Sequence, residues 1–511
     1  MYTIHQSQIK LVIGATARLT SLFTALFAIL GSSSAHAESL LIKNVHIISG
    51  VAAKPSSLQD VLVQDGQIKA IGKQLTSTGP RLNAHGKFLI PGLIDSHVHL
   101  DGVPGYTTSK PEDAEMLKQA HEQMPRSYLY FGFTTVLDLT GDPKFIANWN
   151  QQVAAPKAYF CAPVVIPNGY PAVWMDKDAQ FTVPAAKYML FDPKQAATYP
   201  QHFVEAAHTP SAVVNAAQQD GASCIKVFYE TGFGPKRNLP VPTVEMIQAV
   251  VQAAHQLDLP VFLHGNSQDA YEFALKTGVD TLVHGMWHEH KNADQLANQE
   301  RLKQMSAEIV KAGIAIQPTI QVLYGEQEEV NPEFFNNPLV SHAIPAKLAT
   351  WYRSAAGQWM KQMLTEELSL STTNPDEQYQ VTKKQYQKPL NTVKRMTAQL
   401  SADGAKIMFG SDTPSGPFYT QFPGINGRWE MDRWLETGMS LSKLFAALTI
   451  ENARALKLDK EIGSIEVGKQ ANLLLLTKNP LDAVSGYDSI EQVIVAGKIH
   501  PRASLSASKF K

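Results

Sequence analysis

The sequence predicts an α/β protein in which a (β/α)8 TIM barrel is joined to a small β-sandwich domain built from both chain ends. Between residues 89 and 458, apolar strand-like runs alternate with longer stretches of helical periodicity, and eight such strands occur. Residues 38–88 and 459–511 instead carry short, closely spaced strand patterns. Eight strands alternating with helices fit a closed barrel better than an open doubly wound sheet.

The length and composition describe an ordinary globular chain. Of its 511 residues, 44% are hydrophobic and 18% are charged, and the formal net charge is −1. This length allows roughly two to three domains, or one large barrel with an appendage. Because the charges balance and no cluster of basic residues occurs, the sequence offers no electrostatic surface for nucleic acid, and we expect no such partner.

The first 37 residues predict a cleaved secretory signal peptide. They contain Lys10 and Arg18 but no acidic residue, then an apolar run at residues 19–30, then small residues up to Ala37. The apolar run is shorter than the about 20 residues that a membrane helix needs. We expect cleavage after Ala37, a periplasmic or secreted protein, and no membrane attachment after cleavage.

Two cysteines remain in the exported chain. Cys161 and Cys224 both lie in or beside apolar runs that we expect to form neighbouring strands. An oxidising compartment permits a disulfide between them, but buried free thiols fit the sequence equally well.

Short strands are expected on both sides of the barrel. At the N-terminal end they are residues 40–49, 61–64 and 67–71, and Asp65-Gly66 between the last two is typical of a two-residue hairpin turn. The strand pattern returns near the C-terminus at residues 463–468, 471–477, 492–495 and 498–499. The two chain ends are therefore expected to build one β domain beside the barrel.

The barrel strands are expected where apolar runs end in turn residues or in polar side chains. The helical stretch after Pro242-Thr243 shows the 3.6-residue period most clearly, with apolar residues from Val244 to Ala254. The eight strands are expected at residues 88–99, 134–139, 158–166, 224–229, 260–264, 281–284, 314–318 and 406–411.

Two long insertions interrupt the barrel pattern. Residues 167–217 are rich in aromatic residues and proline, and residues 321–403 are long and polar, with helices expected at 345–365 and 376–399. Both follow barrel strands, so both should emerge at the carboxyl-end face, where catalytic loops and lids lie. For the second insertion, a structural or oligomer-forming role is an equal alternative.

Residues with metal-binding chemistry end several of the predicted strands. An aspartate or histidine at a strand end is usually structural, and a lysine can extend its amine to solvent. Their joint occurrence in one alternating series indicates a metal site, because the carboxyl ends of barrel strands meet in one cavity. The residues are His97, His99, Lys226, His264, His284 and Asp412.

This order of residues resembles the amidohydrolase superfamily. The resemblance is carried by Pro91-Gly-Leu-Ile-Asp-Ser-His97, by Gly410-Ser-Asp412, and by Gly463-Ser-Ile-Glu-Val-Gly468 followed by Ala471-Asn-Leu-Leu. Within the superfamily, the strand Ile225-Lys226-Val227 is similar to that of the imidazolonepropionase-related branch, which includes prolidases and dipeptidases acting on Xaa-Pro or Xaa-Arg/Lys bonds. Imidazolonepropionases themselves lack this lysine.

The resemblance implies a binuclear metal-dependent hydrolase that cleaves an amide C–N bond, in a dipeptide or an N-acyl amino acid. His97, His99 and Asp412 would hold one ion and His264 and His284 the other, with carboxylated Lys226 bridging them. Zinc suits this nitrogen-rich set best, although manganese, cobalt and iron also accept it. A metal-bridging hydroxide would attack the amide carbon, and Asp412 would shuttle the proton to the departing amine.

The expected partner is a small molecule or a short peptide, and a homo-oligomer is left open. The loop after Lys226 offers Tyr229 and Arg237 as substrate contacts, because the guanidinium fork suits a peptide carboxylate. A solvated basic loop explains the same residues equally well, and the loop departs from the Ser-Gly-Gly type of the prolidase-like relatives.

The sequence leaves three other functions open. A lactonase or esterase would use the same site, since attack on any carbonyl carbon needs the same hydroxide. A mononuclear deaminase is less favoured, because related deaminases place a glutamate where this chain has Ser267, and because Lys226 is present. A non-catalytic binding protein could keep the barrel, but such proteins lose ligands that are all present here.

Overall fold

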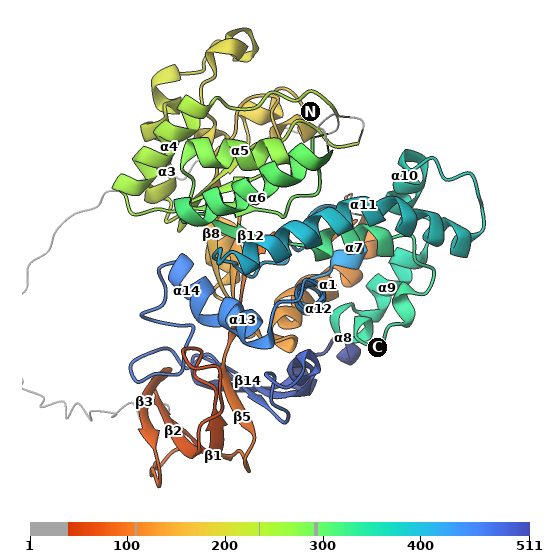
Figure 1. Ribbon diagram of the computed structural model, residues 1–511. Coiled ribbons are helices and arrows are strands. Elements are labelled where there is room, and N and C mark those ends of the chain that lie inside the picture. Colours follow the sequence, from red (N-terminus) through yellow and green to blue (C-terminus); the bar gives the residue numbers. More distant parts are fainter. Residues whose placement is uncertain (1–38, 108–109, 235, 291–294, 511) are drawn as a thin grey trace, which may run out of the picture. The chain divides into compact units, whose positions relative to one another are not determined.

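The computed structural model describes residues 39–107, 110–234, 236–290 and 295–510, and the predicted signal peptide lies outside them. The described residues form one compact unit. A parallel sheet surrounded by helices carries the candidate metal-binding residues, and a mixed sheet unites strands from the two ends of the described chain (Figure 1). The α/β fold class is thereby confirmed.

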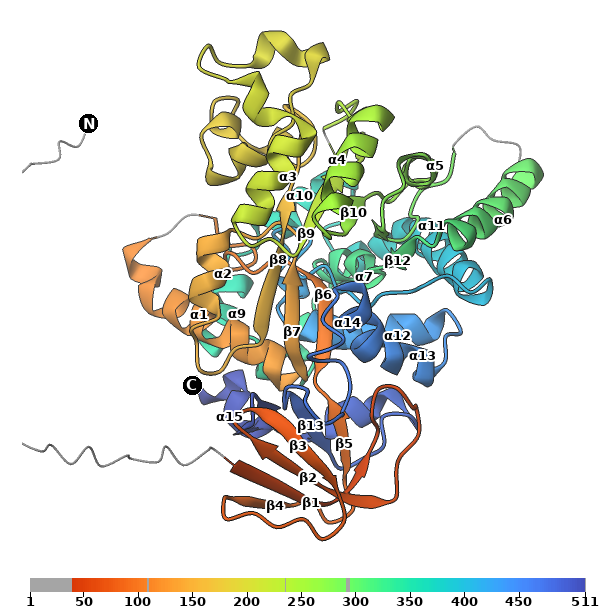
Figure 2. The ribbon, with the colours of Figure 1, turned by 90° about the vertical axis from the view of Figure 1, so that its left-hand side faces the viewer.

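The mixed sheet joins the two chain ends by direct strand pairing. Its central pair is β5 (Phe88–Pro91) and β13 (Leu473–Leu476), which run antiparallel (Figure 2). The order along the sheet is β15-β14-β13-β5-β1-β2-β3, with β4 paired to β1. The other strands are β1 (Ser39–Ile47), β2 (Leu58–Gln64), β3 (Gln67–Gly72), β4 (Arg81–Asn83), β14 (Ile490–Val495) and β15 (Lys498–Pro501).

Two local predictions for this sheet have different outcomes. Asp65 and Gly66 have φ angles of 51° and 74°, as the predicted hairpin turn between β2 and β3 requires. The strand predicted at residues 463–468 is wrong, because this segment is a series of turns. Gly463 and Gly468 at its ends have φ angles of 87° and 94°, which leave the extended conformation.

The parallel sheet has seven strands that pair in sequence order. Each strand is almost entirely buried, as expected for a sheet covered by helices on its outer face. The strands are β6 (Leu93–Val98), β7 (Phe133–Asp138), β8 (Lys157–Pro163), β9 (Cys224–Phe228), β10 (Val261–His264), β11 (Thr281–Val283) and β12 (Ala315–Gln317).

The eighth predicted strand, at residues 406–411, is an irregular segment with isolated parallel bridges. On one side, Met408 N donates to Ile316 O of β12 at 2.9 Å. On the other side, Asp412 N donates to His97 O of β6 at 2.8 Å. Asp412 has a φ angle of 53°, so the chain leaves strand geometry where it meets β6. The segment still connects the first and last strands of the sheet and closes the ring.

Helices cover the outer face of the parallel sheet. The helix predicted after Pro242 is α4 (Val244–Gln256): the Thr243 side chain caps its N-terminus, and its apolar face is buried. No helix of the described residues is long and apolar enough to cross a membrane. The other covering helices are α1 (Ala114–Tyr130), α2 (Pro143–Trp149), α3 (Pro210–Gln219), α5 (Gln268–Thr277), α6 (Gln295–Ala312), α12 (Ile425–Glu436), α13 (Leu441–Ala446) and α14 (Asn452–Ala455), and α15 (Arg502–Leu505) follows β15.

The two insertions differ in structure. Residues 167–209 contain only short 3-10 turns before α3 begins. The second insertion is helical. The helix expected at 345–365 is interrupted at residues 354–358, where Gly357 packs so closely that a Cβ there would lie 2.2 Å from the Trp351 carbonyl oxygen. Its helices are α7 (Gln321–Glu328), α8 (Val340–Ala343), α9 (Ala346–Arg353), α10 (Trp359–Glu367) and α11 (Pro375–Ala402).

A buried carboxylate anchors the start of this second insertion. Glu430 of α12 accepts hydrogen bonds from the backbone N–H groups of Ile320 and Gln321, at 3.1 and 2.6 Å, and from Trp434 Nε1 at 2.9 Å. These bonds cap the N-terminus of α7.

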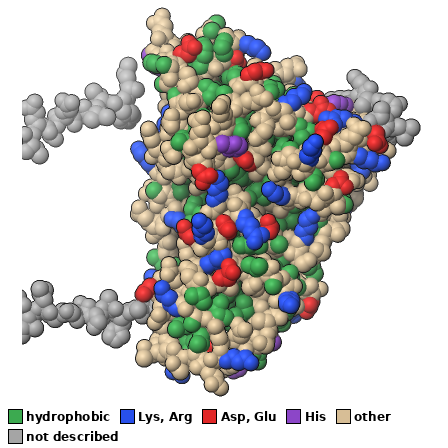
Figure 3. Space-filling model, turned by 60° about the vertical axis from the view of Figure 1, so that its left-hand side comes forward, with side chains coloured by type: hydrophobic (Ala, Val, Ile, Leu, Met, Phe, Trp, Pro, Cys, Tyr) green, Lys and Arg blue, Asp and Glu red, His purple; other side chains and the backbone are tan. Residues whose placement is uncertain are grey.

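The face shown in Figure 3 carries acidic and basic side chains intermixed, in keeping with the net charge of −1.

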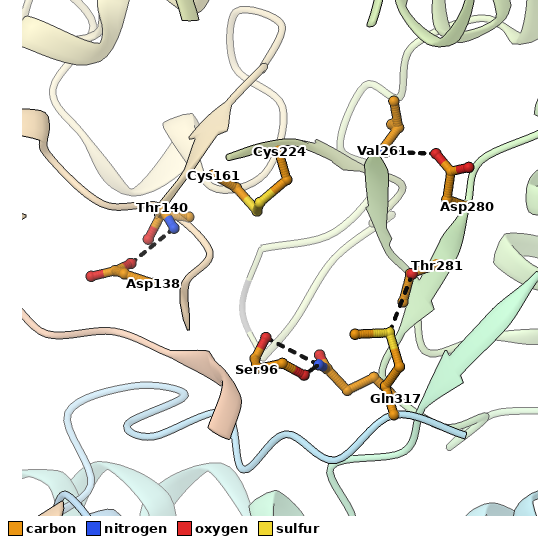
Figure 4. Close-up of a disulfide and its surroundings, with 10 residues drawn as sticks. Ser96, Asp138, Thr140, Cys161, Cys224, Val261, Asp280, Thr281 and Gln317 are labelled. Carbon is orange, nitrogen blue, oxygen red and sulfur yellow. Dashed lines mark hydrogen bonds between the residues drawn. A yellow bond between two sulfur atoms is a disulfide. The ribbon is translucent and has the colours of Figure 1, made fainter. Parts of the chain in front are cut away.

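A disulfide inside the ring of strands links β8 to β9. Cys161 and Cys224 are opposite each other in the register of the two strands, and both are fully buried (Figure 4). They pack with apolar side chains from other strands, including Phe262 and Val283. The sequence left open whether the two cysteines are bonded, and the structure decides in favour of the disulfide. Cys224 lies two residues before Lys226.

Replacing both cysteines with alanine is expected to lower the free energy of unfolding. The disulfide closes a loop with a sequence separation of 63 residues, and the chain-entropy model gives about 4 kcal/mol for a loop of this size. Urea unfolding followed by circular dichroism would measure the change. As a control, a reductant should lower the unfolding midpoint of the wild-type chain only. Equal midpoints for the wild type and the double variant would contradict the expectation.

Candidate metal centre

Two histidines from the end of β6 meet the aspartate of the closing segment. His97 Nε2 lies 3.0 Å from Asp412 Oδ1, and His99 Nε2 lies 3.2 Å from the same oxygen. One ligand atom from each of the three residues lies within 4.8 Å of the others, as a shared cation requires. His97 and Asp412 are 1% and 4% exposed, whereas the side chain of His99 is 24% exposed.

A second histidine pair adjoins this group. His264 Nδ1, at the end of β10, lies 3.0 Å from His284 Nε2, directly after β11. His284 Nδ1 is 3.6 Å from Asp412 Oδ2, so the aspartate connects the two pairs of histidines. Burial lowers the pKa of both His264 and His284. Both rings are therefore neutral at pH 7, as metal ligation requires.

Lys226 of β9 lies in a buried environment. It is 2% exposed, and its Nζ atom has no hydrogen-bond partner among the described residues. Burial lowers its pKa to about 7, although the charge on Asp412 acts in the opposite direction. Its charge in turn lowers the pKa of His97, His264 and His284, so it faces the ring interior with them. A buried amine without a hydrogen-bond partner fits a residue that would bind a further group at this site.

The charge on Asp412 is stabilised by its neighbours. Burial alone would raise its pKa, but the hydrogen bonds and charges of His97, His99 and His284 hold the pKa well below its usual range. Asp412 is therefore a carboxylate at neutral pH and can ligate a cation or accept a proton.

Three polar residues that the sequence analysis missed support the β6 side of the site. Asp95 accepts hydrogen bonds from Ser411 N at 2.9 Å and Ser411 Oγ at 2.6 Å, directly beside Asp412. Thr140 Oγ1 lies 2.8 Å from His99 Nδ1, and Asp138 Oδ1 lies 3.8 Å from it. Asp95 and Asp138 occur within strands, so their position in an apolar run was the available signal.

The structure gives Tyr229 and Arg237 contacts outside this group of residues, and their role as substrate contacts stays a prediction. Tyr229 lies on the opposite face of the chain from Lys226, and its ring packs on Phe273 of α5 at 4.7 Å. Arg237 is exposed, and its guanidinium donates to Gly232 O at 3.2 Å. The period of two that continues from Lys226 reaches Glu230 instead of Tyr229.

Aromatic side chains from three loops surround the second histidine pair. Tyr170, from the first insertion, lies 4.7 Å from His264 between ring centres and 5.4 Å from Phe233. Trp287 lies 5.6 Å from His284, and its buried indole N–H has no partner among the described residues. A substrate at this site would therefore meet an apolar wall with few polar atoms.

Parts of the chain are similar in sequence to known proteins. Residues 390–500 match the model of the amidohydrolase family. The chain is 40% identical over 68 residues to a dihydroorotase of Acetivibrio thermocellus, a stretch that covers 13% of this chain and only 16% of the dihydroorotase.

Two solved structures share the fold over most of the chain. A Xaa-Pro dipeptidase with bound methionine is 20% identical, with a TM-score of 0.62, covering 91% of this chain and 100% of the dipeptidase. A putative prolidase from Bifidobacterium longum is 21% identical, with a TM-score of 0.58, covering 91% of this chain and 95% of the prolidase. The chain therefore shares the fold of these two proteins, and its match to the amidohydrolase family model covers residues 390–500.

Proposed function

We propose that this chain is a metal-dependent hydrolase that cleaves the amide C–N bond of a dipeptide or an N-acyl amino acid. The observation that carries the proposal is the convergence on Asp412 of two histidine pairs, beside a buried lysine whose amine has no hydrogen-bond partner among the described residues. The fold that it shares with a Xaa-Pro dipeptidase supports a peptide-like substrate. Lactones and other esters would be attacked by the same groups, so the experiment includes them.

The donor set fits two divalent ions, with zinc as the first candidate because most of the ligands are imidazoles. His97, His99 and Asp412 would hold one ion, and His264 and His284 the other. Lys226 would hold both after its neutral amine adds to carbon dioxide, which forms an N–C bond and releases one proton. When bound, two such ions supply an activated water and polarise the substrate carbonyl.

The chain's own residues would manage the proton. Asp412 stays ionised because the surrounding histidines hold its pKa well below its usual range. It can therefore accept a proton from the attacking water and transfer it to the departing amine nitrogen. The aromatic wall of Tyr170, Phe233 and Trp287 would exclude bulk water from this transfer.

Dialysis against a chelator is expected to remove about two ions per chain and to abolish hydrolysis, and zinc should restore both. Elemental analysis would count the ions. Free amino acid released from panels of dipeptides and N-acyl amino acids, and acid released from lactones, would report the activity. A folded chain that binds no metal and cleaves none of these compounds would overturn the proposal in favour of a binding protein.

A further inference from the structure

Glu230 is a buried carboxylate next to the second histidine pair. It lies two residues after the end of β9 and is 7% exposed. Its Oε2 atom lies 3.4 Å from His264 Nε2 and 3.3 Å from Asn266 Nδ2, and its Oε1 atom accepts from Gly232 N at 2.7 Å. No lysine or arginine of the described residues forms an ion pair with it.

The loop after Glu230 is built closely around the carboxylate. Gly232 has a φ angle of 141°, which other residues rarely adopt, and a Cβ at this position would lie 2.2 Å from the Lys236 carbonyl oxygen. Only glycine fits there, and its backbone N–H points at Glu230. The position of the carboxylate is therefore specified by the backbone of the loop as well as by the packing of its own side chain.

The groups around the Glu230 carboxylate are hydrogen-bond donors: the Gly232 N–H, the Asn266 amide and a ring nitrogen of His264. A buried carboxylate can only accept hydrogen bonds. The His264 nitrogen that faces it must therefore carry a proton, which leaves Nδ1 of His264 with a free electron pair toward His284.

Aromatic packing alone cannot choose this orientation of the imidazole. Tyr170 and Phe228 hold the plane of the His264 ring, with ring centres 4.7 and 5.9 Å away. A rotation of 180° about the Cβ–Cγ bond leaves this plane unchanged but exchanges the nitrogen positions with carbon positions, and apolar neighbours barely distinguish the two arrangements. A hydrogen-bond acceptor at one edge does distinguish them, because only one arrangement places an N–H against it.

We propose that Glu230 is a positioning residue, which fixes the proton of His264 on Nε2 and directs Nδ1 toward the cation shared with His284. This inference rests on the proposed function, because it concerns the second ion. A carboxylate behind a metal-bound imidazole orients the ring and increases the basicity of the ligating nitrogen. Thr319 Oγ1, 2.9 Å from His284 Nδ1, is placed to orient the other ring in the same way.

The test compares Glu230→Ala, Glu230→Gln and Asn266→Ala with the wild type. Glu230→Ala should weaken binding of one of the two ions by about 10- to 100-fold, and the ion at His97, His99 and Asp412 should stay. Glu230→Gln should lie between Glu230→Ala and the wild type, because its amide oxygen still accepts but carries no charge. Asn266→Ala is the matched control, since it removes a neutral donor from the same carboxylate oxygen.

Ion affinities would be measured by competition with a chelator, and the cobalt-substituted proteins would be compared by visible absorption. Unfolding of the metal-free proteins would show whether the variants fold. A merely structural role would weaken both ions equally or change only the unfolding, and either result would overturn the inference. So would wild-type affinity in Glu230→Ala. A wild-type protein without metal would instead refute the proposed function itself, which keeps the two failures distinct.

Discussion

Asp412→Asn is expected to lower kcat by about 10²- to 10⁴-fold, the range found when a general acid–base group is lost. Asparagine has nearly the same shape, and its amide oxygen can still face His97 and His99, so we expect the variant to fold and to keep its metal. It cannot take up a proton from water at neutral pH. Turnover of the best substrate and metal content would be measured on the same preparations.

Asp192→Asn provides a matched control for this substitution. Asp192 is also buried, at 4% exposed, but its carboxylate accepts from Lys194 N and from Gln195 in the first insertion. Its substitution should leave kcat unchanged. Near-normal turnover in Asp412→Asn with full metal content would show that another group moves the proton.

Lys226→Ala is expected to remove one ion and nearly all activity. The side chain would otherwise bridge both ions as a carbamate, and its loss leaves them without a shared anionic ligand. Added acetate or propionate should restore part of the activity of Lys226→Ala, because a small carboxylate can occupy the vacated volume. Carbon-13 NMR of the wild type under labelled carbon dioxide would detect the carbamate directly. Full activity of Lys226→Ala without added carboxylate would refute the bridging role.

The pH dependence follows from the same lysine. Carbon dioxide adds to the neutral amine only, and burial lowers the pKa of Lys226 to about 7. Roughly half of the amine is therefore neutral at pH 7, against less than about 0.1% for an ordinary lysine. Below pH 7 the amine becomes protonated, so reconstitution with metal should fail progressively as the pH falls and improve as it rises.

Lys226→Met separates the functional role from a structural one. Methionine has a similar length but no polar atom, and Lys226 Nζ has no partner among the described residues. The unfolding free energy of the metal-free Lys226→Met protein should equal or exceed that of the wild type, because an unsatisfied buried amine is lost. Lower stability would mean that the lysine supports the fold instead of the site.

Much of the site could be predicted because strand patterns are local. An apolar run that ends in a polar side chain marks a strand end, and the barrel geometry then brings such ends together. His97, His264 and His284 were found in this way. The same rule failed at residues 463–468, where a strand-like composition forms turns because Gly463 and Gly468 take positive φ angles. It was weaker at residues 406–411, which form an isolated bridge instead of a regular strand.

The sequence by itself thus determined the fold class and the convergence of His97, Lys226, His264 and Asp412, since both depend on apolar periodicity and on the order of strands. Only the tertiary structure decided that Cys161 bonds to Cys224, that Tyr170 covers His264, and that Glu230 contacts this ring while Tyr229 does not. These contacts join residues from separate strands and loops. The path of a loop in space follows from packing against distant segments, which leaves no periodic trace in the sequence.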